Sequence, residues 1–158
     1  RKGTRTQCNY NIKHFICHPK VPTARALLNY LIFHGAGSAE SVIKTDAATR
    51  FYNSIPTVWG ETRFLDGEMG KYVVVARRSG SDWYVSMLNA GDKKQISLPL
   101  DFLKNRKGYT ATLYYQASEE KKDVVDTKKI RLENRNEVII DLVGNSGCVL
   151  HFSILNFQ

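Results

Sequence analysis

Short hydrophobic stretches separated by polar turns follow one another from about residue 61 to the end of the chain. In several of them hydrophobic and polar residues alternate, which is typical of a β-strand with one buried face. Residues 108–117 are the clearest case, because alternation places Tyr109, Ala111, Leu113 and Tyr115 on one face. The pattern predicts strands at 63–67, 71–78, 82–89, 93–100, 108–117, 126–134, 137–143 and 147–155. Short strands at this spacing predict a mainly β fold, an antiparallel β-sandwich of about eight strands.

The first third of the chain has a different pattern. Leucines and alanines recur at helical spacing over about 23–33, and a second short helix is expected over 45–54, closed by Pro56. Residues 1–22 show no clear period. These observations predict three parts: a poorly defined basic lead-in at 1–22, a helical segment at 23–55 and a β-sandwich domain at 56–158.

The net charge of +8 is concentrated at the N-terminal end. Residues 1–39 contain six basic side chains and no acidic one, whereas the remaining residues contain 17 basic and 15 acidic ones. A basic arm can bind nucleic acid through phosphate contacts. We interpret this one as a loosely ordered lead-in, because the main body shows no basic stripe interleaved with aromatic residues.

Neither the ends of the chain nor its cysteines indicate the cellular compartment of the protein. No apolar run reaches the length of a membrane span, and no signal peptide is visible. Cys8, Cys17 and Cys148 have no spacing of a disulfide framework, so they leave the redox compartment open. The chain begins with Arg1, which suggests a fragment, a processed product or a truncated gene product.

Candidate chemical groups are few. Glu61, Asp66 and Glu68 form one acidic cluster, which an acid pair or a calcium site would need, but acids near a turn more often form turns and face solvent. A second group contains possible zinc ligands, although the distance between its two cysteines is too long for a structural zinc site: Cys8, His14, Cys17 and His18. We interpret His34 as a helix-end residue and His151 as a strand side chain. We therefore predict no catalytic, cofactor-binding or metal-binding residue in this chain.

Two tryptophans leave two interpretations open. The ring faces of Trp59 and Trp83 could stack on a sugar, since aromatic faces pack well on apolar C–H surface. They could equally be core or interface residues, which is the interpretation we favour.

The most distinctive motif of the chain is the segment at residues 55–85, "IPTVWGETRFLDGEMGKYVVVARRSGSDWYV". It resembles the C-terminal region of glycoside hydrolase family 97, α-glucosidases and α-galactosidases of Bacteroides-type bacteria. The resemblance rests on a set of matching positions: Pro56, Thr57, Trp59, Glu61, Thr62, Gly67, Gly70, Tyr72, Ala76, Arg77, Arg78, Gly80, Trp83 and Val85. It extends over about 55–155, and the segment 23–54 resembles the end of the catalytic barrel.

The resemblance implies an N-terminal sandwich and a (β/α)₈ barrel upstream of this region, with the catalytic residues and calcium ligands of the family in those parts. It therefore implies an accessory C-terminal β-sandwich that is inert alone and supports the barrel or oligomer contacts. Trp59, Arg77 and Arg78 would then serve packing and interdomain contacts. The expected partners are the catalytic barrel or a second copy in a homodimer, with an α-linked saccharide as a possible ligand and neither membrane nor nucleic acid. Its location would be periplasmic if it follows the family.

Two positions depart from the family pattern. Gly60 stands where the family has Asp, and "GAGSAES" at 35–41 replaces an apolar strand. Both lie where the sandwich would meet the barrel. The alternative is an independent carbohydrate-binding sandwich that uses Trp59, Trp83 or tyrosines.

Overall fold

The computed structural model describes residues 46–104, 108–116, 125–132 and 136–154. Within these ranges one helix, α4 (Asp46–Ser54), precedes eight strands, and the expected mainly β fold and the helix near 45–54 are confirmed. The strands are β1 (Glu61–Glu68), β2 (Tyr72–Ser79), β3 (Asp82–Asn89), β4 (Lys94–Pro99), β5 (Tyr109–Tyr115), β6 (Asp126–Ile130), β7 (Glu137–Leu142) and β8 (Gly147–Ile154). The helix predicted at 23–33 and the lead-in at 1–22 lie outside the described residues.

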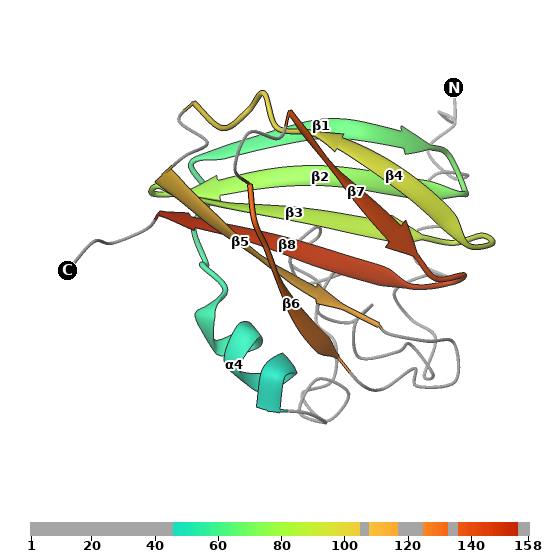
Figure 1. Cartoon of the computed structure of the whole chain (residues 1–158), viewed down its shortest axis with the longest axis horizontal. Helices are drawn as coiled ribbons and strands as arrows, with labels where there is room; N and C mark the ends of the chain where they lie inside the picture. Colours follow the sequence, from blue (N-terminus) through green and yellow to red (C-terminus); the bar gives the residue numbers. More distant parts are fainter. Residues whose placement is uncertain (1–45, 105–107, 117–124, 133–135, 155–158) are drawn as a thin grey trace, which may run out of the picture.

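The strands form two antiparallel sheets. Six of them make a large sheet in the order β1-β2-β3-β8-β5-β6, and the other two pair as β4-β7. Figure 1 shows β4 and β7 lying across one face of the large sheet, which makes a sandwich of two unequal layers. Strand β8 comes last in the sequence but lies between β3 and β5, so the end of the chain closes the middle of the large sheet.

The hydrophobic core lies between the two sheets. On β7 every second residue is buried, and the same alternation on β5 turns the predicted face, Tyr109 to Tyr115, toward the core. The largest fully buried side chains include Phe152, Met87, Leu98, Leu100 and Leu150. Their removal from water is the main favourable term for folding.

The opposite face of the large sheet, called here the outer face, is covered in part by α4. The ring of Phe51 lies 4.2 Å from the ring of Tyr114 and 6.5 Å from that of Tyr84, both measured between centroids. Ile55 is buried directly after the helix, and the chain then enters β1 at the edge of the sheet. The described residues that directly precede β1 therefore lie in part on the outer face.

Turn residues explain the strand boundaries. Gly70 (φ 78°) and Gly80 (φ 57°) adopt left-handed conformations in the hairpins β1–β2 and β2–β3, where glycine avoids a steric cost. Pro99 ends β4, as predicted from its missing N–H. Strand β1 is longer than the predicted 63–67 and contains a bulge between Phe64 and Asp66.

Candidate docking face

Large apolar side chains are exposed at the β1–β2 side of the outer face. Phe64 on β1 is 68% exposed and pairs across the strands with Val75, which is half-buried. A side chain at Gly67 would lie 3.1 Å from the Phe64 ring, so the glycine leaves room for this ring to lie flat on the strand. Val58, just before β1, is 75% exposed. Exposed apolar residues that gather on one surface often mark an interaction site.

An aromatic stack continues this surface toward the centre of the sheet. Trp59 meets Tyr84 edge to face, with ring centroids 5.4 Å apart, and Tyr84 stacks on His151 at 4.3 Å. The His151 ring is held in turn by Asp82, whose Oδ2 lies 2.9 Å from Nε2. Burial, with a smaller effect from the Asp82 carboxylate, raises the pKa of the Tyr84 hydroxyl to about 12. The Tyr84 hydroxyl is therefore uncharged at neutral pH.

Trp59 carries a polar group that the described residues leave unsatisfied. Its ring is only partly exposed, but its Nε1 is buried and has no hydrogen-bond partner in the described part of the chain. The guanidinium of Arg77 lies 5.5 Å from the centre of the ring, and burial lowers the pKa of Arg77. A buried donor without an acceptor is costly, so an acceptor supplied by a partner would stabilise this arrangement. Trp59, Phe64, Val75 and Arg77 are called the docking face below.

Trp83 and Arg78 lie on the other side of the same sheet. Trp83 is 4% exposed and packs on Phe102 at 5.1 Å, so it occupies a core position and offers no open ring face. Arg78 contacts Glu61 at 3.2 Å and donates a hydrogen bond from Nη1 to the carbonyl of Gly80. Arg77 and Arg78, to which the resemblance assigns one common role, therefore act on opposite faces, because successive residues of a strand alternate.

The three acidic side chains of β1 each interact with different partners. Glu61 accepts hydrogen bonds from Arg63 and Arg78, and these two cations lower the pKa of its carboxyl group. Tyr72 donates a hydrogen bond to Asp66 at 3.0 Å, and Glu68 pairs with Lys71. Within the ranges that the structure describes, no three metal-ligating side chains gather, so these carboxylates do not fit a calcium site.

Other candidates from the sequence fall elsewhere. The possible zinc ligands Cys8, His14, Cys17 and His18 lie outside the described residues, as does His34. His151 is a strand residue as expected, but its contacts with Tyr84 and Asp82 were missed. Asp82 and His151 are 69 residues apart, and no spacing signal links them.

In the described part of the chain, no helix combines the length and apolar character of a membrane span.

Solved structures with a similar fold come from glycoside hydrolases. A β-arabinopyranosidase superposes with a TM-score of 0.61 and 28% identity, over 74% of this chain and 18% of that chain. A family 97 enzyme from Pseudoalteromonas sp. strain K8, in complex with acarbose, gives a TM-score of 0.62 at 21% identity, over 87% of this chain and 23% of that chain. At this identity the second likeness shows the fold alone.

Curated relatives are much longer than this chain. A retaining α-galactosidase of Bacteroides thetaiotaomicron is 36% identical over 95 residues, which are 57% of this chain and 14% of the relative. A probable retaining α-galactosidase of Streptomyces bingchenggensis is 35% identical over 65 residues, which are 41% of this chain and 10% of the relative. The matched region is thus a small part of each relative.

The family match covers most of the sandwich. The sequence model of the glycosyl-hydrolase 97 C-terminal family, described as an oligomerisation domain, matches residues 58–153, from just before β1 into β8. This range contains both sheets and the docking face, and it bears out the resemblance noted in residues 55–85. The chain belongs to the glycosyl-hydrolase 97 C-terminal family.

Proposed function

We propose that this chain is the C-terminal sandwich of a longer family 97 glycoside hydrolase, in which it holds the catalytic part on its docking face and supports contacts between copies. The observation that carries the proposal is the family match over 58–153, together with the 14% of the Bacteroides relative that the chain spans. The substrate class would be an α-linked galactoside, following the names of the two curated relatives.

The docking face supports a partner on this side of the sheet. Phe51 of α4, the helix that directly precedes the sandwich, packs on the outer face. Phe64 would be removed from water by such a partner, and the Nε1 of Trp59 would receive an acceptor. Each of these changes favours docking.

The acidic side chains of β1 support an accessory role. Hydrolysis of a glycosidic bond uses two carboxyl groups that face each other across the substrate. Glu61, Asp66 and Glu68 are instead held by Arg63, Tyr72 and Lys71 along one edge strand. We infer that the catalytic carboxylates, and the ligands of any calcium ion, belong to upstream parts of the enzyme.

A chimera tests the proposal. Residues 46–158 of this chain replace the matched C-terminal region of the Bacteroides α-galactosidase, and hydrolysis of an aryl α-galactoside is compared with that of the intact and truncated enzymes. We expect the chimera to recover activity and thermal stability that the truncated enzyme lacks. Phe64→Asp in the chimera should reduce the recovery, because it places a charge in the contact.

Matched variants sharpen this test. Trp59→Phe keeps an aromatic ring and removes the donor, so it should weaken the recovery less than Phe64→Asp. Met69→Asp, at an exposed position in the β1–β2 turn, is the control. A chimera no better than the truncated enzyme would contradict the proposal, as would turnover of the substrate by the isolated 158-residue chain.

A further inference from the structure

The side of the small sheet that points away from the core lies on the opposite side of the molecule from the docking face. Ile139 of β7 points outward here and is 55% exposed, while its neighbours Val138 and Ile140 are buried. Its cross-strand partner is the small Ser97, and Pro99 of β4 is exposed nearby on the same side. The centre of this side therefore exposes aliphatic side chains.

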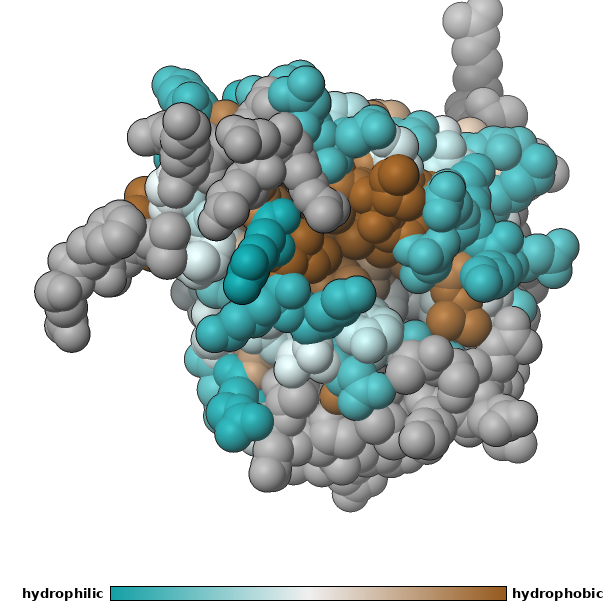
Figure 2. Space-filling model, in the orientation of Figure 1, coloured by the Kyte–Doolittle hydropathy of each residue, from teal (hydrophilic) through white to brown (hydrophobic). Residues whose placement is uncertain are grey.

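Hydrophobic side chains gather in the middle of this side. Figure 2 shows a hydrophobic area at the centre of the view, in a shallow hollow bordered by hydrophilic side chains. Ile130 of β6 and Tyr115 of β5 are partly exposed at the rim of the core, in addition to Ile139. An apolar centre with a polar border is the usual composition of a protein interface.

The border carries charges of both signs that are not paired with each other. The Glu137 carboxylate accepts a hydrogen bond from Ser97, and the Asp141 carboxylate accepts one from Gln95 at 3.0 Å. Both donors are neutral, and neither acid has an ion-pair partner in the described part of the chain.

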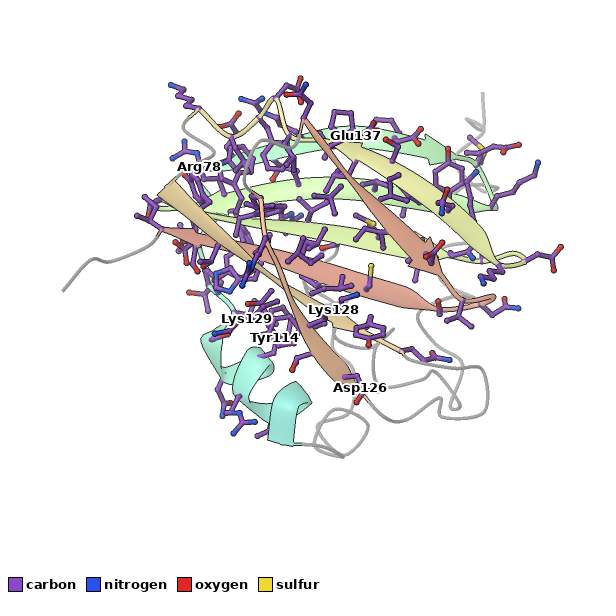
Figure 3. The ribbon with its side chains drawn as sticks, viewed as in Figure 1. Arg78, Tyr114, Asp126, Lys128, Lys129 and Glu137 are labelled. Carbon is purple, nitrogen blue, oxygen red and sulfur yellow. The ribbon has the colours of Figure 1, made fainter. Side chains whose placement is uncertain are left out.

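A basic group of this side lies on the edge strand of the large sheet. Lys128 of β6 is exposed and, in register with the core residue Leu113, points to the side of the small sheet. Among the described residues, it contacts no carboxylate. Figure 3 shows Lys128 well separated from Glu137. Lys128, Glu137, Ile139 and Asp141 are called the β7 face below.

We propose that two copies of this chain meet through the β7 face. A two-fold axis would bring Ile139 of each copy toward the centre and would place Glu137 and Asp141 of one copy against Lys128 of the other. A surface that carries both signs around an apolar centre is complementary to itself, as a two-fold contact requires. The second copy is favoured over the catalytic part, because α4, which directly precedes the sandwich, packs on the opposite side. This inference rests on the proposed oligomeric role.

Sedimentation equilibrium of the 158-residue chain tests the contact. We expect a reversible dimer whose dissociation constant rises at least about tenfold in Ile139→Asp, since a buried charge replaces buried aliphatic surface in both copies. Ile139→Thr keeps a β-branched residue and should weaken the dimer less. Phe64→Asp, an equally severe change on the docking face, is the matched control and should leave the dimer intact. Circular dichroism confirms that each variant is folded.

A charge exchange provides a second, independent test. Lys128→Glu should weaken the dimer about threefold to tenfold, and adding Glu137→Lys should restore it. Because the two residues are far apart within one copy, restoration requires a contact between copies.

The outcomes separate this inference from the proposed function. A dimer that survives Ile139→Asp and the charge reversal, or one that Phe64→Asp dissociates, overturns the β7 face and leaves the oligomeric role intact. A chain that stays monomeric at every concentration contradicts the β7 face directly. In that case the oligomeric state of the chimera decides whether the oligomeric role fails as well.

Discussion

At the scale of single residues, position on the pleat decides what a side chain does. Arg77 and Arg78 are adjacent in the sequence, yet one lies over Trp59 on the outer face and the other contacts Glu61 on the opposite face. The tryptophans separate in the same way, with Trp83 in the core and Trp59 on the docking face. A motif read as a cluster along the chain can thus contain residues with unrelated roles.

Backbone conformation gives a prediction at two glycines. Gly80 has φ 57°, so Gly80→Ala should lower the free energy of unfolding by about 1 kcal/mol because of left-handed strain. Gly60 has no such conformation, and an added Cβ would make only ordinary contacts with Arg78, the closest at 3.8 Å. Gly60→Ala should therefore be neutral or slightly stabilising. Urea unfolding of both variants measures the difference, and equal losses would contradict the assignment of strain to Gly80.

At the scale of elements, the small sheet depends on its inward residues. Strands β4 and β7 pair only with each other and reach the large sheet through alternate side chains such as Ile96, Leu98 and Ile140. Two strands alone are marginal in water, so this packing rather than their hydrogen bonds keeps them in place.

Neighbouring isoleucines of β7 give a matched test of this dependence. Ile140 is 3% exposed and Ile139 is 55% exposed. Ile140→Ala should cost about 2–5 kcal/mol through lost burial and a cavity, whereas Ile139→Ala should cost less than about 1 kcal/mol in the monomer. Denaturant unfolding at concentrations below dimer formation measures both. Similar costs would mean that β7 does not present these faces as described.

At the scale of the whole molecule, buried groups with raised pKa values make stability depend on alkaline pH. Burial raises the pKa of Tyr84 and of Cys148 to about 12 each, and it also raises that of Tyr114. In the unfolded chain these groups ionise near their ordinary values of 10.0 for tyrosine and 9.0 for cysteine. Above those values the unfolded state binds fewer protons than the folded state, so stability falls as pH rises.

The free energy of unfolding should therefore fall by at least about 2 kcal/mol between pH 9 and pH 12. Tyr84→Phe should flatten this fall above pH 10 and leave the neutral range without a new pH dependence. Urea unfolding at a series of pH values measures the slope. An unchanged slope in Tyr84→Phe would show that Tyr84 ionises as easily in the folded state as in the unfolded one.

Much of the fold was predictable because its signals are local. Strands β2 and β3 were expected at nearly their observed bounds, since alternating residues and a glycine turn mark them within a few positions. The place of β8 between β3 and β5 was not predictable, because the pairing of strands distant in sequence leaves no local pattern. The stack of Tyr84 on His151 and the contact of His151 with Asp82 depend on that pairing, so they were missed for the same reason.

The sequence by itself determined the strands, the turns and the family, because hydrophobic alternation, glycine positions and the motif in 55–85 are all carried by neighbouring residues. Only the tertiary structure decided which strands lie together, which arginine and which tryptophan face outward, and where the unpaired charges gather. The physical reason is that burial and complementarity belong to surfaces, and these surfaces are assembled from segments that are remote along the chain.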